Sequence, residues 1–345
     1  MWYKIPAMRN NFNRRQLLKL AAALPAMSAL PAAAKEKVWQ GIFVIMQTPF
    51  HEDLSIDEDS LRKETDYLIR GGVHGLVWPA GAGESTSLSY NERMKFAPSV
   101  VKETKGRIPC LIGVHGANKF EAMEYARHAE KIGADGLHAL GPTDRYGDQE
   151  YMEDYFTSIA SVSKLPMCLQ VSNSGMTTDF LLRMSEKLPS VKILKLEMGN
   201  IPHDVEKVVR ERTRPDIYPS TGGGAVNLYT EMERGSGGTM AGAGFADIQA
   251  QIWDWFQEGK KEESLDLFQK FLLSAVLERR TTFVLMKEIL KRRGIFKNTI
   301  MRRTSKFTMN AEDLRELDQI MELLQPHFPS SCRTCCMRPT ATHQS

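Results

Sequence analysis

The sequence predicts an α/β fold, a (β/α)8 TIM barrel with an appended C-terminal helical segment. Short apolar runs alternate with amphipathic stretches from Gly41 onward, and eight such strand-then-helix units follow one another. Serial units of this kind build a parallel sheet, and eight strands are the number that closes into a barrel. The chain has 345 residues, of which 42% are hydrophobic, so it can bury the core of one large domain of this type.

The predicted elements follow from the spacing of apolar residues. Short apolar runs predict strands at 42–47, 74–78, 109–114, 136–140, 167–171, 191–195, 216–220 and 238–240. Apolar residues three and four positions apart, often after a capping Asp or Asn, predict helices at 59–69, 90–105, 119–132, 148–161, 179–187, 201–210, 226–234 and 247–258. Further helical patterns cover 261–280, 282–293 and 311–324. We therefore place the barrel at 35–258 and the C-terminal helices packed on it at 259–328.

The first 34 residues are predicted to be a twin-arginine-type export signal rather than part of the fold. Arg14 and Arg15 precede an apolar segment at 20–34 that ends in three alanines, the order expected of a basic region, an apolar region and a cleavage site. The segment is too short and too interrupted by proline to span a membrane. The mature protein is therefore expected to be periplasmic after passage through the twin-arginine export machinery. The alternative is an amphipathic N-terminal helix.

Charge and cysteine usage narrow the classes of partner. The formal net charge is +3 with basic and acidic residues mixed, so no nucleic-acid partner is expected. Cys110 and Cys168 fall in non-neighbouring predicted strands and are expected to be buried free thiols. Three further cysteines lie in a tail at 329–345 that we predict to be disordered, and one C-x-x-C pair alone is poor evidence for zinc. No metal site and no cofactor are predicted.

A lysine at the end of the sixth predicted strand is the main catalytic candidate. The run Val191–Glu197 is mostly apolar, with Lys192 at its solvated start and Lys195 at its far end. Burial against apolar neighbours disfavours the charged amine, and a neutral amine forms Schiff bases with ketones. Most lysines beside a strand are surface charges, so this interpretation depends on the residues that accompany Lys195.

The loop after the second predicted strand is a candidate anion site. Active sites of such barrels form at the carboxyl ends of the strands, where this loop lies. Gly81, Ala82 and Gly83 allow the backbone to approach a ligand closely, and successive free N–H groups form a concavity that suits a carboxylate. The alternative is an ordinary tight turn.

Several short motifs resemble those of a known family in their order and separation. They are Gly41, Thr48-Pro49-Phe50, Gly83-Glu84-Ser85, Gly133-Ala134-Asp135-Gly136, Pro142 and Lys195. Together they resemble the dihydrodipicolinate synthase / N-acetylneuraminate lyase family of class I Schiff-base aldolases, over residues 41–324. The segments Gly222–Gly224 and Lys287–Leu290 look like a divergent, less characterised branch of it.

The resemblance implies a reaction without a cofactor, in which Lys195 forms a Schiff base with pyruvate or another small 2-oxo acid. The substrate carboxylate would rest on the amides of Ala82 and Gly83. Gly81 and Ala82 replace the family's usual pair of hydroxyl residues, so backbone donors survive and side-chain donors do not. The family's strand-five signature and its arginine are also absent, which argues against dihydrodipicolinate synthase activity.

A proton shuttle is still required, because imine formation and bond cleavage both move protons. Asp144 occupies the position of the family's catalytic tyrosine and Tyr146 lies close by, so both are catalytic candidates. His115 ends the third strand and either touches substrate or caps its loop, whereas His138 lies mid-strand and is expected to be a satisfied core histidine. Glu197, two residues past the lysine, either raises the lysine pKa or serves as an acid–base group.

The candidates for substrate binding share positions at the carboxyl ends of the predicted strands. They are Gly81, Ala82, Gly83, Glu84, His115, Asn173, Gly222 and Gly223. Glu84 is equally able to anchor its own loop, and Gly222 and Gly223 leave room for a ligand and an imine.

The predicted function is that of a Schiff-base-forming lyase, that is, an aldolase, hydratase-aldolase or dehydratase, with carbon–carbon chemistry favoured over dehydration. The alternative is a catalytically degenerate barrel that binds a 2-oxo acid without turnover because the tyrosine is lost. A metal-dependent barrel enzyme is disfavoured, since no convincing ligand set is seen at the predicted strand ends. The resemblance also suggests a homodimer or homotetramer.

Overall fold

The computed structural model describes residues 37–145, 147–172, 176–303 and 308–329. The predicted export signal at 1–34, nearly all of the predicted tail at 329–345, Tyr146 and Asn173 lie outside these described residues. What the sequence predicts for these residues stays a prediction.

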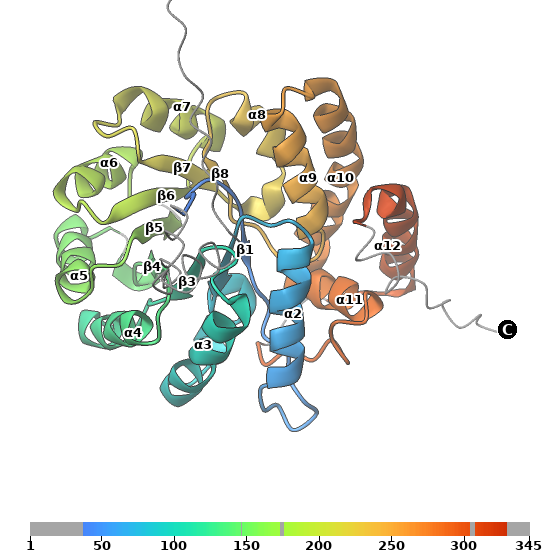
Figure 1. Cartoon of the computed structure of the whole chain (residues 1–345), viewed down its shortest axis with the longest axis horizontal. Helices are drawn as coiled ribbons and strands as arrows, with labels where there is room; N and C mark the ends of the chain where they lie inside the picture. The colour runs from blue at the N-terminus through green and yellow to red at the C-terminus, as the bar shows by residue number, and fades with distance from the viewer. Residues whose placement is uncertain (1–36, 146, 173–175, 304–307, 330–345) are drawn as a thin grey trace, which may run out of the picture. The chain divides into compact units, whose positions relative to one another are not determined.

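Eight strands form a closed parallel barrel, which confirms the predicted fold class (Figure 1). They are β1 (Gly41–Ile45), β2 (Gly75–Trp78), β3 (Cys110–Gly113), β4 (Gly136–Leu140), β5 (Met167–Ser172), β6 (Val191–Glu197), β7 (Tyr218–Thr221) and β8 (Gly238–Thr239). Each strand pairs with the next in chain order, and β1 closes the ring against β8 through the pairs Gly41–Gly238 and Ile42–Thr239. All eight predicted strands are present, with ends within two residues of those predicted.

A helix follows each strand, and these helices surround the barrel (Figure 1). They are α2 (Glu58–Arg70), α3 (Tyr90–Thr104), α4 (Lys119–Lys131), α5 (Gln149–Val162), α6 (Thr178–Lys187), α7 (Ile201–Glu211), α8 (Leu228–Met232) and α9 (Ala246–Gln257). The predicted caps are in place: the side chain of Asp57 accepts from the Ser60 amide, and that of Asn118 accepts from the Phe120 and Glu121 amides. Such side chains satisfy N–H groups that have no partner within the helix.

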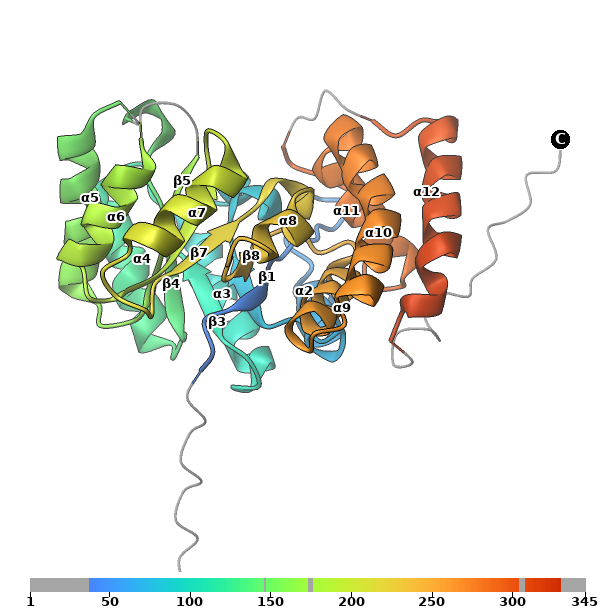
Figure 2. The same cartoon turned by 90° about the horizontal axis from the view of Figure 1, so that it is seen from above.

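Three C-terminal helices complete the fold: α10 (Lys261–Thr281), α11 (Phe283–Arg292) and α12 (Ala311–Leu324). Figure 2 shows α10 between α9 and α12, and the barrel and these helices belong to one compact unit. Met286 of α11 packs so closely on the segment after β8 that a Cβ at Gly244 would lie 2.9 Å from its sulfur. Within the described ranges, no helix has the length and hydrophobicity needed to cross a bilayer.

Strand register decides which side chains meet inside the barrel. Gln170 of β5 pairs with Lys195 of β6, and Lys195 pairs with Ser220 of β7. A separate apolar cluster fills the inside of the ring and includes Phe43, Ile45, Val77, Leu111, Cys168, Ile193 and Met240. Cys110 and Cys168 are buried on strands that are not neighbours, as predicted.

Candidate active site

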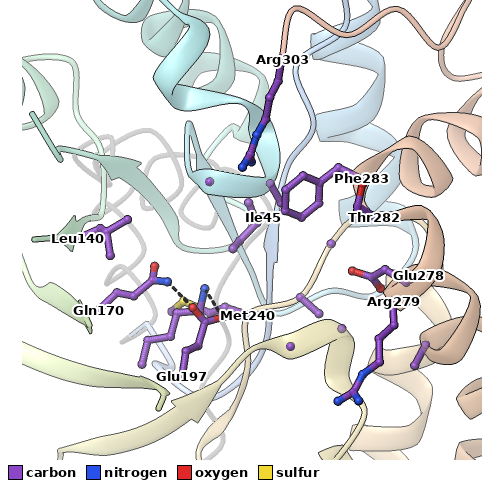
Figure 3. Close-up of a pocket in the computed structure, with 18 of the residues that line it drawn as sticks. Ile45, Leu140, Gln170, Glu197, Met240, Glu278, Arg279, Thr282, Phe283 and Arg303 are labelled. Carbon is purple, nitrogen blue, oxygen red and sulfur yellow. Dashed lines mark hydrogen bonds and ion pairs between the residues drawn. The ribbon is translucent and has the colours of Figure 1, made fainter. Parts of the chain in front are cut away.

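A cavity of about 740 Å³ lies at the carboxyl ends of the strands, with the C-terminal helices forming one of its walls (Figure 3). The barrel contributes Ile45, Gly81, Ala82, Gln170, Lys195, Glu197 and Gly223, and the C-terminal segment contributes Glu278, Arg279, Thr282, Phe283 and Arg303. Parallel strands direct their carboxyl ends to one rim, so residues far apart in sequence meet here.

Lys195 lines this cavity although its side chain is only 2% exposed. Its Nζ lies 3.3 Å from Glu197 Oε1, and Gln170 Nε2 donates a hydrogen bond of 2.5 Å to Glu197 Oε2. The β5–β6 register produces this arrangement because it places Gln170 beside Lys195. A buried amine thus faces a cavity with a carboxylate within reach for proton exchange.

Gly222 lies directly behind the Lys195–Glu197 pair. A Cβ at this position would be 1.9 Å from Glu197 Oε1 and 3.2 Å from Lys195 Cε. Any other residue would displace the pair, so this position requires glycine. Gly223 lines the cavity itself, whereas Gly222 contributes space behind the lysine.

His138 and Cys168 lie opposite each other on β4 and β5, fully buried. His138 is a core histidine, as predicted. Burial, reinforced by the nearby charge of Lys195, lowers the pKa of His138 to about 3. Burial raises the pKa of Cys168 to about 12. Both side chains are therefore neutral at physiological pH and do not serve as the proton shuttle.

The turn after β2 is a short 3-10 helix, Gly81–Gly83, with free amides at its start. The Gly83 amide donates to Ala80 O at 3.0 Å, so in this geometry it already has a partner within the turn, and its binding of a carboxylate stays a prediction. The amides of Gly81 and Ala82 bond to no described residue, and both residues line the cavity. Thr48 Oγ1 donates to Gly83 O at 2.6 Å and holds the turn in place.

Glu84 does not line the cavity, which corrects its assignment to substrate binding. Its side chain is fully buried, with Oε1 2.6 Å from Lys287 Nζ and Oε2 accepting from the Arg303 amide at 2.7 Å. Lys287 also donates to Ile300 O at 2.7 Å. The alternative role weighed from the sequence, an anchor for its loop, is therefore the one that this geometry supports.

His115 and Asp144 are likewise outside the cavity lining. His115 Nε2 bonds to Ser85 Oγ at 2.7 Å, behind the same turn, and burial with the nearby Arg93 charge holds its pKa well below the usual value. The Asp144 side chain is 79% exposed and pairs with Arg145. The residue that occupies the position of the family's catalytic tyrosine therefore faces solvent. These two residues are not positioned to exchange a proton with a substrate on Lys195.

Glu278 of α10 is a cavity residue that the sequence did not reveal. Its carboxyl group makes no hydrogen bond or ion pair with a described residue, and burial raises its pKa to about 7. Gly224, at a φ of +70°, leaves the room it occupies, since a Cβ there would lie 2.9 Å from Glu278 Oε2. The local sequence does not distinguish Glu278 from the other charged residues of α10. Its burial depends on the loop around Gly224, some fifty positions earlier in the chain.

Glu278→Gln is expected to stabilise the protein at pH 8 and to change little at pH 4.5. The folded state favours the protonated carboxyl, so its raised pKa removes stability as pH rises from 4.5 to about 7. The gain at pH 8 should be on the order of 3 kcal/mol in the free energy of unfolding, measured by urea denaturation. Glu262→Gln, exposed at the start of α10, is the control. An equal effect of Glu278→Gln at both pH values would contradict the assignment.

Metal-ligating residues do not gather in the described part of the chain. Within it, no three His, Cys, Asp or Glu side chains lie close enough together to hold an ion.

We compared the chain with protein families, with known proteins and with solved structures. The model of the dihydrodipicolinate synthetase family matches residues 38–323. The chain belongs to this family. The predicted family and the predicted enzyme class, a lyase of the dihydrodipicolinate synthase-like family, are thereby confirmed.

Relatives within the dihydrodipicolinate synthetase family carry different activities in their names. An uncharacterized DapA-like lyase of Pyrococcus abyssi is 31% identical over 233 residues, 66% of this chain and 78% of its own. The probable 2-dehydro-3-deoxy-D-pentonate aldolase YjhH of Escherichia coli K12 is 29% identical over 257 residues, 72% and 85% of the two chains.

Solved structures of the family show the same fold. The 4-hydroxy-tetrahydrodipicolinate synthase of Methylacidiphilum fumariolicum SolV aligns with a TM-score of 0.75 and 23% identity, over 86% of this chain and 99% of its own. YagE of E. coli K12, solved in complex with pyruvate, aligns with a TM-score of 0.74 and 20% identity, over 84% and 99%.

Proposed function

We propose that this lyase acts on pyruvate or another small 2-oxo acid through a Schiff base on Lys195. The observation that carries the proposal is the position of Lys195 Nζ, buried yet facing the cavity and 3.3 Å from a carboxylate oxygen. Such an amine can lose its proton to the carboxylate and then attack a carbonyl carbon. Aldol cleavage or condensation is favoured, in keeping with the name of the YjhH relative.

The proposed aldol cleavage can be written in steps that use Lys195 and Glu197. Lys195 first gives a proton to Glu197 and adds as the neutral amine to the keto carbon; the same proton, returned by Glu197, then lets the carbonyl oxygen leave as water, and a protonated imine remains. If the 2-oxo acid carries a hydroxyl at C4, the bond between C3 and C4 can break: its electron pair moves into the imine to give an enamine, the C4 hydroxyl loses its proton, and C4 leaves as the carbonyl carbon of the second product. Protonation at C3 and hydrolysis then release pyruvate and restore the amine. Glu197 lies close enough to Nζ to move these protons.

The carboxylate of the 2-oxo acid would lie at the turn after β2. The free amides of Gly81 and Ala82 are adjacent in the chain and both belong to the cavity wall. Adjacent amides at the start of a short helix favour an anion. The hydroxyl groups that family members usually carry here are missing, so other donors must supplement these two.

The second candidate function is a barrel that binds a 2-oxo acid without turnover. It is favoured by one observation, the position of Asp144, which stands in the tyrosine's place but faces solvent. A barrel of this kind would keep the imine-forming lysine and lack efficient proton transfer to the substrate.

Trapping with borohydride distinguishes these functions. Incubation with pyruvate and borohydride should add one reduced pyruvate unit to the intact mass, and peptide mapping should place it on Lys195. Lys195→Met should abolish the adduct, whereas Lys192→Met, which removes the strand's other lysine, should not. Absence of an adduct with pyruvate and a panel of 2-oxo acids would overturn the proposal. An adduct without exchange of the pyruvate methyl protons for deuterium would favour the binding barrel.

The cellular location and the oligomeric state of the protein are also proposals. Export to the periplasm through the twin-arginine machinery rests on the arginine pair and apolar segment within 1–34. Assembly as a homodimer or homotetramer rests on the family resemblance alone.

A further inference from the structure

Arg303, in the segment that follows α11, lines the same cavity as Lys195. The two barrel residues at the anion-binding turn, Gly81 and Ala82, carry no side-chain donor. Figure 3 shows the Arg303 side chain extending into the cavity on the side of this turn, whose ribbon is cyan. A guanidinium group there supplies what the turn lacks, a charged donor for a carboxylate.

The backbone that carries Arg303 is fastened to the anion-binding turn. The Arg303 amide donates to Glu84 Oε2 at 2.7 Å, and Glu84 immediately follows the turn. The preceding residue, Arg302, bonds to both carboxylate oxygens of Glu92 at 2.5 and 2.8 Å and to Leu54 O at 2.8 Å. These bonds fix the position from which the Arg303 side chain starts.

The guanidinium of Arg303 is available for a ligand. It makes no hydrogen bond or ion pair with the residues that the structure describes, and its contact is with the Phe283 ring, 5.7 Å from the centroid. Arg279 also lines the cavity, but Figure 3 shows its guanidinium directed away from the turn. Apart from Lys195, Arg303 is therefore the cationic residue that lies on the side of Gly81 and Ala82 among the described cavity residues.

We propose that Arg303 binds the carboxylate of the 2-oxo acid together with the amides of Gly81 and Ala82. This inference rests on the proposed function and adds to it a specificity residue from outside the barrel. A guanidinium presents paired N–H donors that match the two oxygens of a carboxylate. The same arrangement orients the substrate, because the remainder of the 2-oxo acid then extends away from Arg303 and past Lys195.

The test compares trapping by pyruvate with trapping by methyl pyruvate, a neutral ester with the same keto group. Arg303→Met should raise the pyruvate concentration that gives half-maximal borohydride adduct by about tenfold or more, since a hydrogen bond to a charged group is lost. It should change the value for methyl pyruvate by less than about twofold on the same grounds. Arg303→Lys keeps the charge without the paired donors and should give an intermediate value for pyruvate.

Arg315→Met is the control for loss of one positive charge, because Arg315 is exposed on α12 and pairs with Glu312. It should leave both half-saturation values unchanged. An unchanged pyruvate value in Arg303→Met, or equal shifts for pyruvate and methyl pyruvate, would overturn the role of Arg303 and leave the proposed function intact. Failure of the wild-type protein to form any adduct would overturn the proposed function and this role with it.

Discussion

Glu197→Gln is expected to slow proton transfer at the lysine by about 10²- to 10⁴-fold, the usual contribution of a positioned acid–base group. Glutamine preserves the size of the side chain and a hydrogen bond with Gln170, but it cannot accept a proton at neutral pH. The measurement is the exchange of pyruvate methyl protons for deuterium, followed by NMR. This exchange requires imine and enamine formation and no second substrate, so it can be measured before the true partner aldehyde is known.

Lys195 should still be trapped by borohydride in Glu197→Gln, although more slowly. That outcome separates loss of the proton acceptor from loss of the fold. Glu124→Gln, on the exposed face of α4, is the matched control and should exchange at the wild-type rate. Wild-type exchange in Glu197→Gln would mean that another group moves the proton, and Glu278 on the opposite wall would be the next to replace.

Lys287→Met is expected to lower the free energy of unfolding by about 3–5 kcal/mol, because it breaks a buried ion pair by removing one partner. Lys287 and Glu84 have side chains 1% and 0% exposed, and their charged atoms are 2.6 Å apart. Methionine fills a similar volume but leaves the Glu84 carboxylate with the Arg303 amide as its described partner. Urea denaturation of the full chain measures the loss.

The double variant Lys287→Met/Glu84→Gln should be more stable than Lys287→Met alone, since it removes the charge that has lost its partner. If the double variant loses the sum of the two single losses, the two side chains act independently and the pair is not the anchor inferred here. An exposed pair on α4, Arg127–Glu124, provides the comparison, because breaking it should cost less than about 1 kcal/mol.

Local patterns in the sequence were sufficient to predict the barrel, whereas the role expected of Lys195 also needed the family resemblance. Each strand and helix depends on residues within about one turn or one apolar run, so their order gave the topology. Lys195 became a catalytic candidate because its strand is apolar and ends at the rim where such barrels bind ligands, and because the motifs that accompany it resemble those of the family. The contact of Lys195 with Glu197 is also local, two positions apart on one strand.

The rest of the site depends on contacts between distant segments, which no local pattern encodes. Glu84 was an open choice between ligand and anchor, and Lys287, 203 positions later, decides it. Glu278 lies on α10 and Arg303 in the segment that follows α11, and each stands among other charged residues, a pattern typical of a solvated surface.

The bonds from Lys287 and Arg303 to Glu84 join a residue that is synthesised early to residues that are synthesised late. The lysine strand emerges from the ribosome well before the segment that clamps the anion-binding turn. A nascent chain that has finished all eight strands still lacks this clamp and one wall of its pocket. The protein can therefore bind substrate in the proposed manner only after the C-terminal segment has been synthesised. A chain that ends prematurely after the barrel has the Lys195 amine but not the complete pocket around it.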